Sequence, residues 1–171
     1  HAFFLHQEGT TEEDSRIIHQ SLLEIEAFLQ YLGVNGYPAV DGHFAPVHLF
    51  AGDDGFRSFS ELVPLGEWLY GTTYQGGVNG HGLLFRFHPG TLDYEVLHEF
   101  ADTDGREPFN GLAVDGTTLY GVCKFGGTAG QGTLWSIESD GSGFEILHHF
   151  DQNTSGFYPH AAPVLLDGKL Y

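Results

Sequence analysis

The sequence predicts a mainly β protein built from repeated antiparallel units of about 50 residues and preceded by one α-helix. The segment Leu69–Phe100 returns fifty residues later as Leu119–Phe150, with glycines and aromatic residues in the same places. The composition agrees, because 25 glycines and an aromatic content of 15% are typical of short strands joined by tight turns. A fixed period of this length indicates a repeat architecture, in which each repeat is one supersecondary unit.

The repeat keeps its register position by position and extends beyond the two full copies. The matched positions include Gly76/Gly126, Gly77/Gly127, Gly80/Gly130, Gly82/Gly132, Phe85/Trp135, Phe59/Phe109, His48/His98/His148 and Phe50/Phe100/Phe150. Because a glycine or a ring recurs at each of them, we expect the same turns and the same packing in each unit.

Short apolar runs separated by turn pairs such as Asp115-Gly116 and Asp140-Gly141 predict strands. We expect these strands at Val47–Phe50, Phe59–Pro64, Glu67–Tyr74, Gly82–His88, Tyr94–Phe100, Gly111–Val114, Thr118–Cys123, Thr133–Glu138, Phe144–Phe150, Ala161–Leu166 and Lys169–Tyr171. Four short antiparallel strands per unit is the make-up of a β-propeller blade. The predicted propeller-like blades occupy about residues 59–100 and 109–150, with partial blades at 45–50 and 160–171.

The predicted ring is incomplete, because a closed propeller has about four or more blades. Three explanations stay open. The chain is a piece of a longer protein, or another chain completes the ring, or the sheets pack without forming a propeller and the N-terminal helix covers an open side.

Residues 1–36 are predicted to form a separate N-terminal segment, and residues 37–171 carry the repeats. Thr10 and Glu13 fit a capping box at the start of a helix that is predicted over about residues 10–32. The apolar stripe of this helix consists of Ile18, Leu22, Ile25 and Leu29. The stripe either packs on the chain's own sheets or docks the chain to another copy or to a larger assembly.

Charge limits the partners of this chain. Six basic residues against 23 acidic ones give a formal net charge of −17, which argues against nucleic acid and anionic membrane surfaces, because both need a basic footprint. The acidic surface serves solubility or attracts cations and basic partners. No apolar run is long enough to span a bilayer. The single cysteine, Cys123, lies in an apolar strand pattern and is expected in the core.

The Gly-rich run Leu69–Gly82, with the pattern Leu-Tyr-Gly-Thr-Thr-x-x-Gly-Gly-x-x-Gly-x-Gly, resembles the bacterial Gloeo/Verruco (GloVer) tandem repeat. The trailing pattern Leu-His-x-Phe…Asp-Gly-x-x-Pro, from Leu97 to Pro108, resembles it too. In the second copy, Val122-Cys123 replaces the Thr-Thr pair. The resemblance covers roughly Val47–Tyr171 and implies a β-propeller-like protein that is secreted or anchored at a bacterial surface. It carries no catalytic residue over to this chain.

Strand parity predicts which connections lie together. Successive strands of a blade alternate in direction, so successive connections alternate between two faces of the ring. The short connections Asp115–Thr117 and Ser139–Gly143 share one face. The long connections share the other, and they are Tyr74–His81, Ala101–Pro108, Lys124–Gln131 and Asp151–Pro159. Because long loops on a rigid scaffold commonly carry binding sites, this long-loop face is the predicted binding surface.

The candidate ligand-binding residues of the long-loop face are Asn79, His81, Asp102, Asp104, Gln131, Asp151 and His160, and the face also carries Arg106, Glu107 and Lys124. They form no nucleophile, paired-carboxylate or metal-ligand motif, so neither a catalytic nor a metal site is predicted. The run Asp102-x-Asp104-Gly105 is similar to part of a calcium loop, but the full set of oxygen ligands is missing, and we expect no cofactor. The repeated His48, His98 and His148 are expected to pack or to hydrogen-bond alike.

The sequence therefore favours a non-catalytic interaction or structural module of an extracytoplasmic bacterial protein, which binds a protein or glycan partner through an acidic long-loop face. One alternative is a carbohydrate-active propeller enzyme, a glycoside hydrolase or lyase, that uses acids on the same face. The other is an accessory subunit of a larger assembly that docks through the N-terminal helix.

Overall fold

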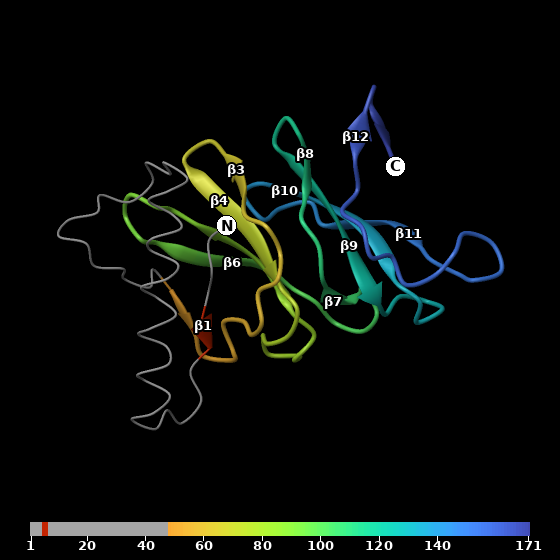
Figure 1. Ribbon diagram of the computed structural model, residues 1–171, viewed down its shortest axis with the longest axis horizontal. Helices are drawn as coiled ribbons and strands as arrows, with labels where there is room; N and C mark the ends of the chain where they lie inside the picture. Colours follow the sequence, from red (N-terminus) through yellow and green to blue (C-terminus); the bar gives the residue numbers. More distant parts are fainter. Residues whose placement is uncertain (1–4, 7–47) are drawn as a thin grey trace, which may run out of the picture.

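The computed structural model describes residues 5–6 and 48–171, so the helix predicted over residues 10–32 lies outside the described residues. The described part is mainly β and contains no helix. It therefore holds no helix that is long and apolar enough to cross a membrane. Two open antiparallel sheets make up most of it, and a two-stranded hairpin follows them (Figure 1). A parallel pair precedes them, in which β1 (Leu5–His6) lies beside β2 (Leu49–Phe50).

The first large sheet is a meander in which each strand pairs with the next. Its strands are β3 (Val63–Leu65), β4 (Trp68–Thr73), β5 (Leu83–Phe87) and β6 (Tyr94–Glu99), in that spatial order. The turn between β3 and β4 needs Gly66, whose φ is +62°, a value that glycine adopts at little cost. The alternation of β5 sends Leu83 and Phe85 to one side of the sheet and Leu84 to the other, and all three are buried.

The second large sheet contains one more strand than the sequence predicts. Its strands are β7 (Arg106–Pro108), β8 (Ala113–Asp115), β9 (Thr118–Phe125), β10 (Thr133–Glu138) and β11 (Glu145–His149). The connection predicted over Ala101–Pro108 thus ends in a strand. The physical reason is the length of β9, which spans 8 residues. β8 pairs with its first half and β7 with its second half, where Arg106 lies opposite Phe125.

A short hairpin after the second sheet repeats the beginning of the first. It consists of β12 (Leu165–Leu166) and β13 (Lys169–Leu170). Val164 and Tyr171 exchange both backbone hydrogen bonds, each at 2.9 Å, just as Val63 lies opposite Tyr70 in the pairing of β3 with β4. The third copy of the repeat therefore starts in the same register.

The two large sheets stack face to face. Tyr70 and Leu84 of the first sheet belong to the same buried cluster as Leu119, Trp135 and Ile137 of the second. Because this cluster takes residues from both sheets, it is an interface as well as a core, and the hydrophobic effect holds the units together.

The end of β6 inserts two rings into this interface. The Phe100 ring is fully buried, with its centroid 5.4 Å from that of Trp135. The His98 ring stacks flat on Phe144, which immediately precedes β11, with centroids 3.7 Å apart and an interplanar angle of 7°. Gly121 leaves room for Trp135, because a Cβ atom at this glycine would lie 2.3 Å from the indole.

The same arrangement occurs one unit earlier. Phe50 packs against Phe85, with ring centroids 5.6 Å apart, and His48 stacks on Tyr94 at 3.8 Å and 7°. The pairs His48/Phe50 and His98/Phe100 therefore each pack a histidine and a phenylalanine on the unit that follows.

Cys123 is buried in the interface between the sheets, as the sequence predicts. Burial raises the pKa of its thiol, and this effect outweighs the opposite effect of the neighbouring Thr133 and Trp135 side chains. Thus Cys123 is a packing residue, since a reactive cysteine needs a lowered thiol pKa and exposure to solvent.

Removing the Phe100 ring tests this packing. Phe100→Ala should lower the free energy of unfolding by about 3–5 kcal/mol, as expected for a fully buried ring. Phe150→Ala removes the ring from the same slot of the next unit, where Phe150 is only half-buried, and should cost less than half as much. Urea unfolding followed by tryptophan fluorescence measures both losses. Equal losses would contradict the packing described for Phe100.

Candidate binding face

The long connections lie together at one end of the sheets. β4 and β6 run in the same direction and end at the same edge, as do β9 and β11 (Figure 1). The backbone N–H of Glu107 donates to the carbonyl oxygen of His81 at 2.9 Å, and that of Tyr158 donates in the same way to Gln131. Gly127 N–H donates to Asp102 O at 2.8 Å. These bonds join the long connections of successive units into one continuous surface, the long-loop face.

The glycine run of the first long connection has a structural role. A Cβ atom at Gly76 would lie 2.5 Å from the carbonyl oxygen of Gly52, and one at Gly82 would lie 2.2 Å from that of Thr73. Both glycines also have positive φ, +89° and +91°. Only glycine allows the backbones to approach this closely, so the run shapes the loop and is no nucleotide-binding motif.

A histidine and an acid hold the second long connection in place. His98 Nε2 lies 3.1 Å from Asp104 Oδ2, and Asp104 Oδ1 accepts a hydrogen bond from the backbone N–H of Ala101 at 2.7 Å. The carbonyl oxygen of Asp104 also accepts from Thr133 Oγ1, at 2.8 Å, in the second sheet. The Asp104 side chain is therefore committed to the shape of its loop and to the link between units.

The same arrangement, in which a histidine bonds to a side chain of the loop that follows it, recurs in the other units. We call it the histidine clamp. His48 Nε2 lies 2.9 Å from Asp54 Oδ2, and Asp54 Oδ1 accepts from the Ala51 N–H. In the third copy, His148 Nε2 lies 2.8 Å from Ser155 Oγ. The prediction of a repeated role is confirmed for hydrogen bonding, which all three histidines share. Flat stacking on an aromatic ring occurs at His48 and His98, whereas His148 is exposed.

Three further candidate residues also support loops. Asn79 Nδ2 donates to the carbonyl oxygen of Phe100 at 3.2 Å. Gln131 Oε1 accepts from the N–H of Gln152 at 2.6 Å, and so ties its own loop to the loop of Asp151. Asp151 Oδ1 accepts from its near neighbour Asn153, at 2.8 Å from the backbone nitrogen. Asn79 is exposed and the other two are half-buried, so parts of all three side chains face solvent.

The remaining candidates are spread along the face. Asp102 pairs with Arg106 at 3.2 Å, and 67% of its side chain is exposed. His81 is half-buried, and His160 is exposed with its ring 6.0 Å from that of Phe109. Among residues 48–171, no hydrogen bond or ion pair joins two of the seven candidate side chains. Their role in binding stays a prediction.

Sequence reasoning missed three aromatic residues on this face. The rings of Phe59, Tyr74 and Phe109 contact one another, with centroids 5.6–5.8 Å apart. The Tyr74 hydroxyl donates a hydrogen bond to Glu107 Oε2. This hydrogen bond is the main reason that the pKa of Tyr74 is raised. The sequence shows that Phe59 recurs as Phe109. Buried phenylalanines such as Phe50 and Phe100 recur with the same period, so the repeat does not show that Phe59 is exposed.

No group of three or more His, Cys, Asp or Glu side chains in the described part of the chain is arranged to hold a metal ion. The expectation that the protein uses no cofactor stays a prediction.

Comparison with known protein families gives a match over most of the chain. A family model described as Gloeobacter/Verrucomicrobia repeat matches residues 36–171. A search of curated proteins finds no match to the chain.

The two aspartates of the second long connection, Asp102 and Asp104, should differ in how much they contribute to the free energy of unfolding. Asp104→Ala leaves the Ala101 N–H without its acceptor and His98 without its partner, and should lower the free energy of unfolding by about 1–3 kcal/mol. Asp102→Ala, the matched change two positions away, removes only an exposed ion pair and should cost about 0.5 kcal/mol or less. Urea unfolding of both variants checks this. A larger loss for Asp102→Ala would contradict the assignment.

Proposed function

Because the chain belongs to the Gloeobacter/Verrucomicrobia repeat family, we propose that it is a non-catalytic β-propeller-like module of an extracytoplasmic bacterial protein. Its long-loop face is the surface that binds a protein or glycan partner. One observation carries the proposal: a repeated and fixed backbone presents side chains that differ from unit to unit.

The stacking of the sheets supports the propeller-like arrangement. Each unit passes its chain from the last strand of one sheet to the first strand of the next, as β6 is followed by β7. The faces of consecutive sheets share one buried cluster, and the hairpin of β12 and β13 begins the next unit in the same register. Radial repetition of four-stranded sheets has these properties.

The backbone of the long-loop face repeats while its side chains vary. The hydrogen bond from Glu107 to His81 and the one from Tyr158 to Gln131 are the same bond in successive units. An acid in one unit is thus replaced by a tyrosine in the next, and a histidine by a glutamine. Variable side chains on a fixed scaffold are what a binding surface needs.

The acids of this face favour binding over catalysis. A general acid or base works from a site that shields it from water and tunes its pKa. Asp104 is used by the fold, and most of the Asp102 side chain is exposed beside Arg106. Docking through the N-terminal helix stays a prediction that concerns residues outside the described part.

A combined screen for binding and turnover tests the proposal. The intact chain is applied to an array of bacterial polysaccharides and to a displayed peptide library. The same polysaccharides are assayed in solution for new reducing ends and for unsaturated products. We expect at least one ligand to bind and no product to form.

Variants then locate the binding surface. Asn79→Ala and Asp102→Ala change exposed side chains on the long-loop face, and at least one should weaken binding about tenfold, which corresponds to about 1.4 kcal/mol. Glu67→Gln, in the turn between β3 and β4 at the opposite end of the sheets, is the matched control and should bind normally. Product formation that Asp102→Asn abolishes would replace the proposal with the enzyme alternative. Binding that is weakened only by Glu67→Gln would place the ligand at the end of the sheets opposite the long-loop face and contradict the proposal.

A further inference from the structure

Three aromatic rings meet on the long-loop face where the first sheet adjoins the second. Phe59 precedes β3, Tyr74 follows β4 and Phe109 follows β7, and we call them the ring cluster. Phe59 is 59% exposed, whereas Phe100 is fully buried. The rings of Phe59 and Phe109 lie 5.8 Å apart, and Tyr74 contacts both at 5.8 Å and 5.6 Å. The cluster therefore offers aromatic surface to solvent at a place where the backbone is fixed.

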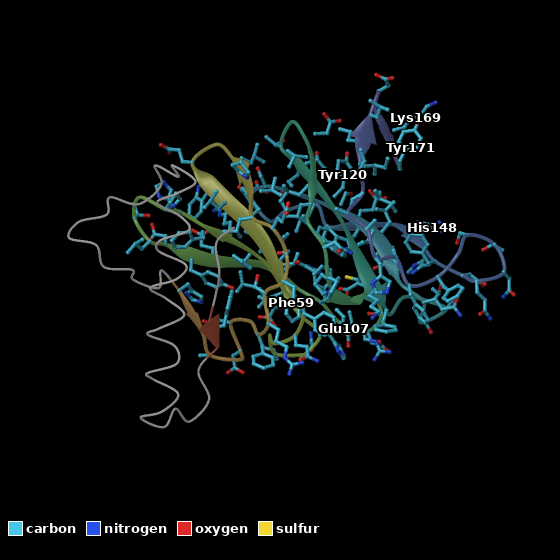
Figure 2. All side chains as sticks on the ribbon, viewed as in Figure 1. Phe59, Glu107, Tyr120, His148, Lys169 and Tyr171 are labelled. Atoms are coloured by element: carbon cyan, nitrogen blue, oxygen red, sulfur yellow. The ribbon has the colours of Figure 1, made fainter. Side chains whose placement is uncertain are left out.

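A carboxylate lies beside the ring cluster. Glu107 accepts the hydrogen bond of the Tyr74 hydroxyl through Oε2, and Figure 2 shows Glu107 close to Phe59 in the lower part of the molecule. Glu107 is half-buried. Its negative charge adds to the negative potential of the ring faces, which attracts cations.

The backbone at Glu107 is unusual. Its φ is +56°, and the equivalent residues of the other units, Arg57 and Tyr158, have φ values of +56° and +53°. The left-handed conformation costs a non-glycine residue roughly 1–2 kcal/mol. Glycine would avoid this cost, yet each unit places a different large side chain here. A strained backbone position that recurs in each unit points to a role for its side chain.

The chain already uses aromatic rings to hold its own cations. Of the five basic residues in the described part, four lie over a ring. The pairs are Arg57 with Phe56 at 5.0 Å, Arg86 with Trp68 at 4.3 Å, Arg106 with Phe125 at 5.3 Å and Lys124 with Phe125 at 4.9 Å. Among the described residues, no basic side chain lies over the ring cluster in this way. The charge of Arg57 acts on Tyr74, where it opposes the rise of the hydroxyl pKa, but the Arg57 guanidinium lies over Phe56. The ring faces of the cluster therefore hold no lysine or arginine from the described part of the chain.

We propose that the ring cluster and Glu107 form a seat for a lysine or arginine side chain from a basic segment of a protein partner. This inference rests on the proposed function and specifies the chemistry of the partner. The net charge of −17 steers a basic segment toward the chain and repels anionic ligands. A neutral saccharide would use the rings but would gain little from Glu107, and it is an outcome of the test.

The experiment measures binding of defined peptides by fluorescence anisotropy. The probes are a fluorescein-labelled peptide of alternating glycine and lysine, the corresponding arginine peptide, and a peptide in which norleucine replaces each lysine. We expect the two basic peptides to bind and the norleucine peptide to bind at least tenfold more weakly, since norleucine keeps the alkyl chain of lysine but lacks the ammonium group.

Variants compared in pairs with equal net charge distinguish binding at the seat from general attraction of basic peptides to an acidic protein. Phe59→Leu keeps the net charge and should raise the dissociation constant about three- to thirtyfold, the range of a cation–π contact. Phe157→Leu is the matched control, because Phe157 is similarly exposed, at 56%, and lies outside the cluster. Glu107→Gln should weaken binding more than Asp102→Asn, which removes the same charge from the same loop. Urea unfolding verifies that each variant is folded.

Several outcomes overturn the inference. Equal affinity of Phe59→Leu and Phe157→Leu would show that the chain attracts the peptides without a defined seat. Equal binding of the norleucine peptide would show that the cation is not recognised. A saccharide that binds the ring cluster while both basic peptides fail would give the site to a different ligand class. A partner that binds the long-loop face but is insensitive to Phe59→Leu and Glu107→Gln overturns this inference alone. Failure of every ligand on that face overturns the proposed function as well.

Discussion

The structure depends on one kind of packing contact, in which a phenylalanine and a histidine from the end of one unit pack against the unit that follows. Phe100 is fully buried against Trp135, and His98 stacks on Phe144. The same histidine is hydrogen-bonded to Asp104, which fixes the loop that leads into the next unit. One residue pair therefore sets the spacing of the sheets and the path of the chain between them, so packing and loop geometry cannot vary independently.

Because sheet packing and loop geometry are coupled, the long-loop face has a fixed backbone although its loops are exposed. The long connections are bonded to one another through the backbone and to the sheets through the histidine clamps. The side chains between these fixed points then vary without cost to the fold. Tyr74 is replaced by Lys124 in the next unit, and Glu107 by Tyr158. Positions that repeat serve the architecture, and under the proposed function the positions that change are the ones that contact a partner.

Most of the sheet architecture was predictable because it depends on local patterns. The strand Thr133–Glu138 has the predicted bounds, and the buried position of Cys123 follows from its apolar strand pattern. β7 was missed because its pairing with β9 is a long-range contact, and the segment Arg106–Pro108 has no apolar alternation. Asp104 looked like a free acid because a sequence does not show that His98 and Ala101 use both of its oxygens. The exposure of Phe59 depends on how the sheets are stacked, which no local pattern contains.

The central claim is that consecutive units stack through the histidine and phenylalanine at the end of each one. The most direct measurement is the nuclear Overhauser effect between the ring protons of His98 and Phe144, which belong to different units and whose ring centroids lie 3.7 Å apart. A strong cross-peak, alongside the cross-strand contacts within each sheet, is the result this account predicts. Intact contacts within both sheets without that cross-peak would show that the units fold but do not stack in this way.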